Sequence, residues 1–403
     1  MPNPPDVSLT GPFQIVQIVA AISPTYGGPS ISSVALHRAL LKRGVNARLL
    51  STSYQDDSGK SLTSQDALEL TGRGTNIWLG TPSRPLKMKN SLKLLYRVLR
   101  DTRNANLIHI EGHYLLPNVY GYLFARLWRV PYGLQPHGAL ENQDHWSMSK
   151  KGIFNLLIGN AMIRHARYVA FASANEASSA SSFVRADQAA IRILGAELSI
   201  PCAPVGSETN DQIDLAARVA ALPRNSCFLY LGRLASVKRP DLLLRAWSKS
   251  IAANYGLLIV AGPDGSFTID DLRQLAQSLA VEDSVVFIGP VAGPEKSWLY
   301  QHAGTFVVSS EHESFGLTIC ESMLAGCHVI ANPEVAASVL LHEANAGDVI
   351  SPMNEVTLAA SLNSAFTNQL HVSQSGERAR TYAQTHVTWT PMVELLTHHA
   401  HIQ

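Results

Sequence analysis

The sequence predicts an α/β protein made of two Rossmann-like domains, each built on a doubly wound parallel sheet. Three observations lead to this prediction. The chain has 403 residues, which is more than one hydrophobic core usually serves. Short apolar runs alternate with amphipathic segments along its length, as in parallel βα units. The alternation is interrupted by a polar, turn-rich stretch at 203–211, which we interpret as the interdomain link, and then begins again.

Six short runs of apolar and β-branched residues in the first half are predicted to be strands. They are residues 14–20, 47–50, 76–79, 107–110, 132–135 and 168–171. Two amphipathic segments between these runs, 30–43 and 116–128, have the spacing of helices. Gly44 is the expected end of the first helix, since glycine readily adopts the left-handed conformation found there.

The same alternation predicts four strands in the second half. They are residues 227–231, 256–260, 285–288 and 305–308. A helix is expected to begin at Pro240, because proline is favoured at the first helical position. After the last strand, apolar residues recur with helical spacing from Leu317 to Leu324, and Gly326 is expected to end that helix.

The composition argues against several classes of protein. Apolar residues make up 46% of the chain and charged residues 16%, which is typical of a globular protein. The formal net charge of +1 gives no reason to expect a nucleic-acid partner. The sequence contains no run of 18 apolar residues, so no membrane-spanning helix is expected. The N-terminus lacks a basic stretch followed by an apolar core, so we expect no signal peptide.

The cysteines indicate a reducing compartment. There are four of them, at positions Cys202, Cys227, Cys320 and Cys327. None belongs to a CxxC pair, and three fall in or near apolar runs, so we expect reduced core thiols in a cytoplasmic protein.

Two glutamates flank the junction between the last predicted strand and the helix that follows it. Glu313 is expected in the loop, and Glu321 about one and a half turns into the helix. The amides of Phe315, Gly316 and Leu317 would point out of the helix N-terminus, where they suit a phosphate or a polar sugar edge. The carboxylates can accept hydrogen bonds from hydroxyl groups, including a ribose diol. The spacing alone equally fits acidic residues that stabilise the helix dipole and bind no ligand.

The stretch that begins at Glu313 resembles a known signature. It reads Glu-Ser-Phe-Gly-Leu, and Glu321 is followed by Ser-Met-Leu-Ala-Gly-Cys-His-Val-Ile. This is similar to the paired-glutamate signature of family-4 retaining glycosyltransferases of the GT-B fold. The usual pattern there is Glu-Gly-Phe-Gly-Leu, then Glu-Ala-Met-Ala, a glycine and Pro-Val-Ile. Ser314 in place of glycine, and Cys327-His328 before the Val-Ile pair, are departures that leave both glutamates in register.

The resemblance implies a site for a nucleotide-sugar donor. Glu313 would be a catalytic residue and, with residues 314–317, would hold the donor sugar, and Glu321 would hold the ribose. Val291, in a Phe-Ile-Gly-Pro-Val segment, would lie along the nucleobase. The resemblance extends over almost the whole chain and is weakest from 50 to 105.

Arg233 and Lys238 lie in the loop after the strand at 227–231, so their charges are expected at the ligand-binding edge of the sheet. A guanidinium group and an ammonium group can neutralise a diphosphate leaving group. Spacing alone leaves open two solvated surface cations. The Gly-Arg-Leu sequence followed by Lys238 is similar to the diphosphate-binding loop of the same family, which implies a catalytic role for both.

Two loops of the first half contain further candidates. Gly27 and Gly28 permit close approach of the backbone to a ligand, although most such turns are only structural. They resemble the Gly-Gly-Pro loop of the family. A lone histidine such as His137 is more often structural than catalytic. Its Gln-Pro-His-Gly-Ala-Leu segment resembles the family's His-Gly-Met-Leu, which implies a catalytic-site contact with the sugar or the acceptor.

His109, Glu111 and His113 are close enough in the sequence to suggest a metal site. Their spacing along a strand and its loop argues against one, with His109 expected to point away. The chain also lacks the Asp-x-Asp pair that would hold a divalent ion on a diphosphate. We therefore expect no metal and no other cofactor.

The resemblance implies the GT-B fold, in which two Rossmann-like domains face each other across a cleft. We expect an acceptor-binding domain at 1–205, joined by the C-terminal helix at 386–403, and a nucleotide-sugar-binding domain at 206–385. The expected activity is transfer of a sugar, with retention of configuration, from a nucleoside diphosphate sugar to a hydroxyl group. A UDP- or GDP-sugar is the expected donor, and a sugar-bearing or lipid-linked molecule the expected acceptor.

Two other functional classes stay open. One is a different GT-B enzyme, such as a sugar-nucleotide epimerase or a phosphorylase. The other is a non-catalytic protein that binds a sugar nucleotide. A nicotinamide dehydrogenase is poorly supported, because no G-x-G-x-x-G follows a predicted strand.

The segment at 84–103 is strongly basic in a nearly neutral protein. It contains seven lysines and arginines against Asp101, so its net charge is 7 − 1 = +6. Leu92, Leu95, Tyr96 and Leu99 recur with helical spacing, as in helices that lie on membranes. The alternative is a surface helix whose apolar face packs on the domain core. The first interpretation predicts peripheral contact with the anionic inner face of a membrane.

Overall fold

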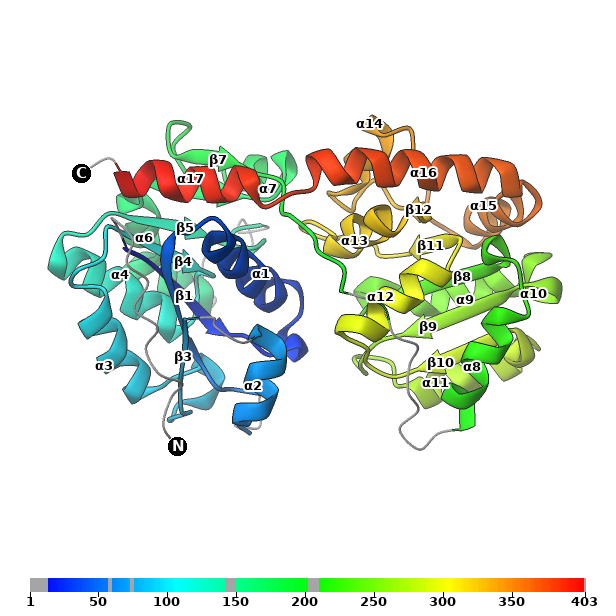
Figure 1. The fold of residues 1–403 in the computed structure, drawn as a ribbon, viewed down its shortest axis with the longest axis horizontal. Coiled ribbons are helices and arrows are strands. Elements are labelled where there is room, and N and C mark those ends of the chain that lie inside the picture. Colours follow the sequence, from blue (N-terminus) through cyan, green and yellow to red (C-terminus); the bar gives the residue numbers. More distant parts are fainter. Residues whose placement is uncertain are drawn as a thin grey trace. The chain divides into compact units, whose positions relative to one another are not determined.

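The computed structural model describes residues 14–56, 60–72, 76–141, 150–199, 201 and 210–401. The chain divides into two compact units (Figure 1). Unit 1 consists of Met1–Gly195 with Trp389–Gln403, and unit 2 of Ala196–Thr388. Most of the expected interdomain link, 203–209, and Cys202 lie outside the described residues.

Unit 1 is built on a parallel sheet of seven strands in the order β3-β2-β1-β4-β5-β6-β7. The strands are β1 (Gln14–Ala21), β2 (Asn46–Thr52), β3 (Ile77–Gly80), β4 (Leu107–Glu111), β5 (Tyr132–Gln135), β6 (Tyr168–Phe171) and β7 (Ala189–Ile191). All six strands predicted for this half are present. Strand β7 was not predicted, because it is three residues long and lies half-exposed at the sheet edge.

The helices of unit 1 pack on both sides of this sheet. They are α1 (Gly28–Lys42), α2 (Ser64–Thr71), α3 (Leu92–Asp101), α4 (Leu116–Trp128), α5 (Lys150–Phe154), α6 (Asn160–His165), α7 (Ala174–Ser179) and α17 (Thr390–His401). Helix α1 begins two residues before the predicted start at Ser30. The last helix, α17, packs on α1, β1 and β4 within the same unit (Figure 1).

Unit 2 is built on a parallel sheet of six strands in the order β10-β9-β8-β11-β12-β13. The strands are β8 (Cys227–Leu231), β9 (Leu257–Ala261), β10 (Val285–Ile288), β11 (Thr305–Val308), β12 (His328–Ala331) and β13 (Asp348–Val349). The four predicted strands are present. Strands β12 and β13 were not predicted, since β12 follows a helix after two residues and β13 has only two.

The helices of unit 2 enclose a core centred on Trp247 and Phe228. They are α8 (Asn210–Ala220), α9 (Pro240–Ser248), α10 (Ala252–Tyr255), α11 (Ile269–Ser278), α12 (Gly293–His302), α13 (Leu317–Ala325), α14 (Ser338–Glu343), α15 (Glu355–Thr367) and α16 (Gln369–His386). Helix α9 begins at Pro240, as predicted, and Gly326 ends α13 with a φ of 74°.

The three cysteines that the structure describes lie in the core, as the sequence predicted. Cys227, Cys320 and Cys327 are buried and free, and burial raises the pKa of the Cys227 and Cys327 thiols to about 11. They are therefore inert core thiols.

Within the described ranges, none of the helices combines the length and the apolar character needed to cross a bilayer. The prediction of two parallel, doubly wound domains is confirmed.

Candidate functional site

The strand order of unit 2 brings two predicted loops together. Strand β8 has β9 on one side and β11 on the other, so the chain changes direction across the sheet at β8 and β11. In parallel sheets, ligands bind beside the carboxyl ends of the strands at such a switch point. The loop after β8 contains Arg233 and Lys238, and the loop after β11 contains Glu313. Ser309 joins the loops, because its Oγ donates to the carbonyl oxygens of Lys238 (2.9 Å) and Arg239 (3.0 Å).

Lys238 and Glu313 form an ion pair in this switch region. The Lys238 Nζ atom lies 2.6 Å from Glu313 Oε1, and the hydroxyl of Ser310 donates to the same carboxylate oxygen at 2.6 Å. The side chains are 27% and 13% exposed. The pair is thus accessible to a ligand, and an anionic ligand at Lys238 would compete with Glu313 for the ammonium group.

The loop around Glu313 is held by backbone contacts with residues 334–337. The amide of Ala336 donates to the carbonyl oxygen of Glu313 (3.2 Å), and the amide of Ala337 to that of Phe315 (2.7 Å). Gly316 precedes α13 with a φ of 96°, and a Cβ atom there would lie 2.6 Å from Cγ1 of Val335. Only glycine fits this position, so the N-terminus of α13 begins at a fixed place beside Glu313.

Residues 314–316 lead into α13, which begins at Leu317. Ser314 and Leu317 are half-buried and Phe315 is buried. The amides in the first turn of a helix have no carbonyl partner one turn earlier, and they point along the helix axis toward the solvent. The first turn of α13 is therefore a positive dipole end next to the Lys238–Glu313 pair.

Glu321 is buried and has two partners on α12. Lys296 Nζ lies 2.5 Å from Glu321 Oε1, and the hydroxyl of Tyr300 donates to Oε2 at 3.0 Å. Burial and the nearby Glu321 carboxylate raise the pKa of Tyr300 well above its usual value. The sequence did not reveal these contacts, although Lys296 and Tyr300 are four residues apart and so lie on one face of a helix.

Two further residues predicted for the donor site, Arg233 and Val291, lie in the loops after β8 and β10. Arg233 is exposed, and its backbone carbonyl accepts a hydrogen bond from Tyr230 at 3.1 Å. Val291 is half-buried and follows β10, which β9 separates from β8. Its loop therefore begins two strands away from the Lys238 loop.

In unit 1, the loops after β1 and β4 lie at the corresponding switch point, and the loop after β5 lies beside the β4 loop. Gly27 has a φ of 85° and precedes α1, whereas Gly28 is exposed and a Cβ atom there would have no neighbour within 4 Å. The backbone conformation explains Gly27. Nothing in the described structure requires glycine at position 28.

His137 is held by a buried carboxylate that sequence analysis did not select for the site. Its Nε2 atom donates to Glu111 Oε2 at 3.2 Å, and His137 itself has a φ of 53°. The hydroxyl of Ser33 donates to the same oxygen at 2.5 Å, and Gln17 Nε2 donates to Oε1 at 3.3 Å. Burial favours the neutral form of Glu111, but the hydrogen bond from His137 and the neighbouring histidines lower its pKa overall. The position of Glu111 at the carboxyl end of a predicted strand was the available signal.

The histidines near Glu111 have other partners. His109 contacts the hydroxyl of Tyr168 (3.0 Å) and Oε1 of Gln135 (3.2 Å), while His113 contacts Oδ1 of Asn155 (3.2 Å). Across the described residues, the one group of three potential metal ligands close enough to share an ion lies in unit 2 and does not include these side chains.

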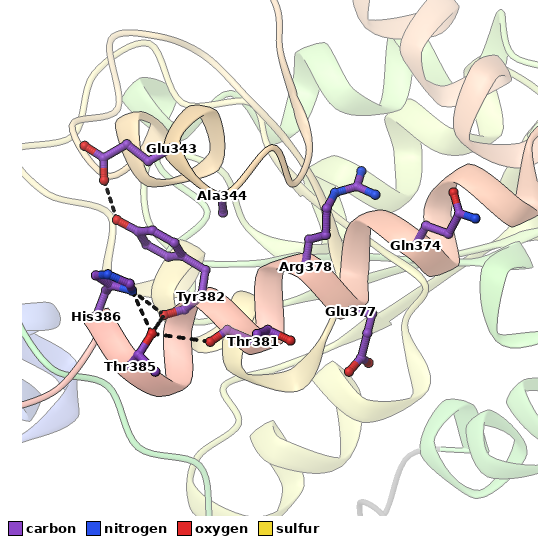
Figure 2. A pocket seen from close by; sticks show the side chains of 9 residues that line it. All are labelled: Glu343, Ala344, Gln374, Glu377, Arg378, Thr381, Tyr382, Thr385 and His386. Carbon is purple, nitrogen blue, oxygen red and sulfur yellow. Dashed lines mark hydrogen bonds between the residues drawn. The ribbon is translucent and has the colours of Figure 1, made fainter.

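One surface pocket of unit 2 lies apart from all predicted site residues. It is lined by side chains of α14 and α16, among them Glu343, Arg378 and Tyr382 (Figure 2). The Tyr382 hydroxyl donates to the Glu343 carboxylate across it. None of the residues predicted from the sequence lines this pocket.

Comparisons with known families agree with the two-unit architecture. Residues 27–197 match the model of the glycosyl transferase 4-like domain, and residues 215–385 match that of the glycosyl transferases group 1. Together the two matches cover most of the chain.

Several curated relatives share one name. The D-inositol 3-phosphate glycosyltransferase of Corynebacterium diphtheriae is 22% identical over 92% of this chain and 88% of its own length. The protein of that name from Acidothermus cellulolyticus is 37% identical, over 29% of this chain and 28% of its own. In two further relatives, from Actinosynnema mirum and Thermomonospora curvata, the match spans only 55% and 37% of the relative.

Solved structures with similar folds include two proteins named as glycosyltransferases and one named as a sucrose-phosphate synthase. Anabaena Alr3699/HepE, in complex with UDP and glucose, has a TM-score of 0.72 at 18% identity, over 96% of this chain and 98% of its own. The sucrose-phosphate synthase of Thermosynechococcus elongatus has a TM-score of 0.70 at 19% identity, with the same coverage. At this level of identity the likeness shows the fold, which is GT-B.

Proposed function

Because this chain joins a glycosyl transferase 4-like domain to a domain of the group 1 glycosyltransferase family, we propose that it transfers a sugar from a nucleoside diphosphate sugar to an acceptor hydroxyl group. The Lys238–Glu313 pair supports the proposal most directly. It places an ammonium group, a carboxylate and a helix N-terminus together beside the switch point of unit 2. A diphosphate needs the first and third of these, and sugar hydroxyls need the second.

The proposed roles follow from the chemistry of each side chain. Lys238 and Arg233 bind the diphosphate and stabilise the negative charge that develops on it as the glycosidic bond breaks. Glu313 and the backbone of 314–317 bind the sugar. Glu321 keeps unused acceptor capacity beyond its bonds to Lys296 and Tyr300, and accepts from the ribose hydroxyls. The loop at Val291 lies along the nucleobase.

In unit 1, we assign His137 to binding of the sugar or of the acceptor. Glu111 orients its ring through the Nε2 hydrogen bond, so the Nδ1 atom is the one left for a ligand. Gly27 and Gly28 allow the donor to approach the first turn of α1. The open space beside Gly28 supports this assignment.

We propose that the configuration at the anomeric carbon is retained. In same-face attack, the acceptor oxygen forms its bond to the anomeric carbon while the bond to the donor phosphate breaks. The acceptor proton passes to a phosphate oxygen of the leaving diphosphate. Glu313 then acts through its charge and hydrogen bonds, and no metal ion is needed where Lys238 and Arg233 neutralise the diphosphate.

The donor and the acceptor are proposed from the relatives and from the sequence. The structural neighbour solved with UDP supports a UDP-sugar, and a GDP-sugar is the alternative. For the acceptor, we propose a sugar-bearing or lipid-linked molecule. The name shared by the curated relatives makes a cyclitol phosphate the second candidate.

A calorimetric screen of UDP, GDP, ADP and TDP with the full chain tests the proposal. We expect one diphosphate to bind, and the Lys238→Met variant to lose that binding. Lys249→Met is the matched control, because Lys249 also forms an ion pair, with Glu355, but directly follows the C-terminal end of α9 and lies outside the proposed donor site. Equal binding by both variants would overturn the assignment of Lys238.

Product analysis with the selected donor separates the remaining classes. A transferase consumes the donor only when an acceptor is present. Epimerisation would need no acceptor, a phosphorylase would consume inorganic phosphate, and a binding protein would show affinity without turnover.

We also propose a peripheral membrane contact through the basic segment at 84–103. On α3, Leu94 and Val98 pack into the core, whereas Leu92 and Tyr96 are 64% and 66% exposed. Five of the seven cations are exposed as well. They are Arg84, Lys87, Lys93, Arg100 and Arg103.

The remaining cations of this segment are directed inward. Lys89 is buried and donates to the hydroxyl of Tyr26 at 2.7 Å, and Arg97 pairs with the buried Asp101 at 2.6 Å. The surface is therefore less basic than the sequence predicted. Sedimentation with anionic vesicles at low salt tests the contact, and no binding there, or equal binding by a Leu92→Ser/Tyr96→Ser variant, would contradict it.

A further inference from the structure

Three potential metal ligands converge in unit 2, away from the proposed donor site. His328 is the first residue of β12, Asp348 is the first of β13, and His371 lies in the first turn of α16. One ligand atom from each side chain lies within 4.8 Å of the other two. This is the only such group in the part of the chain that the structure describes.

The sheet register explains why these residues meet. Ile330 of β12 pairs with Asp348 of β13, and side chains two residues apart on a strand share a face, so His328 and Asp348 point the same way. Gly347 makes the pairing possible. It has a φ of 128°, and a Cβ atom there would lie 2.4 Å from the carbonyl oxygen of Val329.

Helix α16 covers the same face and supplies the third ligand. The helix packs on β12, and the side chain of Asn368 accepts from the amide of His371 at 3.1 Å, which fixes the first turn. Ser375, four residues further on, lies on the same side of the helix as His371. Its Oγ lies 2.8 Å from Nδ1 of His328.

The second nitrogen of His328 is the independent indication of a ligand. His328 is fully buried, and its Nε2 atom makes no hydrogen bond to any residue that the structure describes. A buried polar atom without a partner is unfavourable. When Nδ1–H donates to Ser375, Nε2 presents a lone pair, and the Nε2 atom lies 3.5 Å from Oδ2 of Asp348. A hydrogen bond at the far nitrogen is what orients metal-binding histidines.

We propose that His328, Asp348 and His371 bind one Zn²⁺ ion that clamps β12, β13 and α16 together. Two imidazoles and one carboxylate are a ligand set that zinc takes in proteins, with water in the fourth position. Ligands bound at about 2 Å to a tetrahedral ion are about 3.4 Å apart, which is close to the His328–Asp348 separation. His371 is exposed and can rotate to close the remaining distance.

The position of the cluster separates it from the proposed donor site. His328 lies at the amino end of β12, whereas Lys238 and Glu313 follow the carboxyl ends of their strands. The ion therefore stabilises unit 2 and takes no part in transfer. At position 328 the chain also departs from the family signature.

Titration of the chelator-stripped full chain with Zn²⁺, and with Co²⁺ as a spectroscopic probe, tests the site. We expect one ion per chain, tetrahedral Co²⁺ absorption bands, and an unfolding transition that rises by roughly 5–10 °C at a hundredfold excess over the Kd. His371→Ala and Asp348→Asn should each weaken binding at least tenfold. Both residues are at least partly exposed, so these variants are expected to fold.

The histidines of α17 provide the matched control. His398 and His401 are three residues apart on a helix, where adventitious metal binding would be expected. If the proposed site holds the ion instead, a His398→Ala/His401→Ala variant should keep full Zn²⁺ affinity. Three results would overturn the proposal: no stoichiometric binding at micromolar Zn²⁺, binding lost in the α17 variant, or binding unchanged in His371→Ala. The absence of stoichiometric binding is the result expected if His328 and Asp348 only pair with each other and hold no ion.

Discussion

The ammonium group of Lys238 lies 2.6 Å from the carboxylate of Glu313, although the two residues belong to loops that follow different strands. The sequence predicted both in the donor site, but for separate tasks. Their pairing means that each neutralises the other while no donor is bound. A diphosphate that binds Lys238 frees Glu313 for the sugar, so donor binding would itself prepare the carboxylate.

Glu313→Gln should separate binding from turnover. We expect most of the transfer activity to be lost, because the neutral amide cannot stabilise positive charge on the reacting sugar. The affinity for the free diphosphate should stay equal or rise, since Lys238 no longer has a competing carboxylate. Steady-state kinetics and calorimetry on the same preparation measure the two effects. The relationship would be contradicted if Glu313→Gln kept wild-type turnover, or if its affinity for the free diphosphate fell together with its turnover.

Arg233→Ala and Lys238→Ala should each weaken binding of the nucleoside diphosphate and slow transfer. Charge-assisted contacts contribute roughly 1.5–3 kcal/mol, which corresponds to about a ten- to hundredfold loss of affinity. The free diphosphate is the ligand to titrate, with Lys249→Ala as the control. If both variants kept wild-type affinity, the phosphate site would have to lie elsewhere.

Gly28→Ala tests whether a ligand approaches the first turn of α1. The position is exposed, a Cβ atom there has no neighbour within 4 Å, and alanine is the better helix former. The unfolding temperature should therefore be unchanged or slightly higher, while kcat/KM for the donor falls about tenfold or more through steric exclusion. Gly27→Ala is the contrasting variant, because its φ of 85° strains any other residue. Unchanged kinetics in Gly28→Ala would remove this loop from the donor site.

The sequence predicted the loops of the site better than its contacts. The strands before Lys238, Glu313 and His137 are buried apolar runs of four or five residues, and such runs are recognisable without a partner. The side chains that contact Glu321 and Glu111 cannot be recognised from the sequence in this way. Lys296 is 25 residues from Glu321, and Ser33 is 78 from Glu111. These contacts depend on strand order, which spacing along one chain does not specify.

Short edge strands were missed for a related reason. Strands β7 and β13 have three and two residues, and their intrinsic preference is too weak to distinguish them from loops. The zinc-binding cluster depends on one of them, since Asp348 meets His328 only through the β12–β13 pairing.

Transfer activity should survive EDTA. Lys238, Arg233 and the N-terminus of α13 can neutralise the diphosphate. The proposed zinc site lies at the amino ends of β12 and β13, whereas the proposed donor site lies at the carboxyl ends of the strands. Chelation should therefore lower the unfolding temperature of unit 2 without changing the initial rate at 25 °C. Rates measured before and after chelator treatment, well below the unfolding transition, provide the test. Loss of activity that Mg²⁺ or Mn²⁺ restores would show that the donor site itself needs a metal.

Unit 1 should lose stability as the pH falls below about 6.5. Burial lowers the pKa of His37 to about 3 and that of His113 to about 4, and also lowers the pKa of His109. His37 faces Glu111, which opposes the shift, and Arg38, which adds to it. In the unfolded chain, histidines titrate near 6.5, so below that pH the unfolded state binds protons that the folded state does not.

The expected slope is about 1.4 kcal/mol per pH unit for each such proton, with full stability above pH 7 and progressive loss down to about pH 4. Urea unfolding at several pH values, followed by hydrogen exchange in unit 1, measures it. His37→Gln should flatten the dependence by about one proton, since glutamine does not titrate. The control is His342→Gln, which removes a histidine that is exposed and lies in unit 2. Identical slopes in wild type and His37→Gln would mean that His37 is protonated in the folded protein.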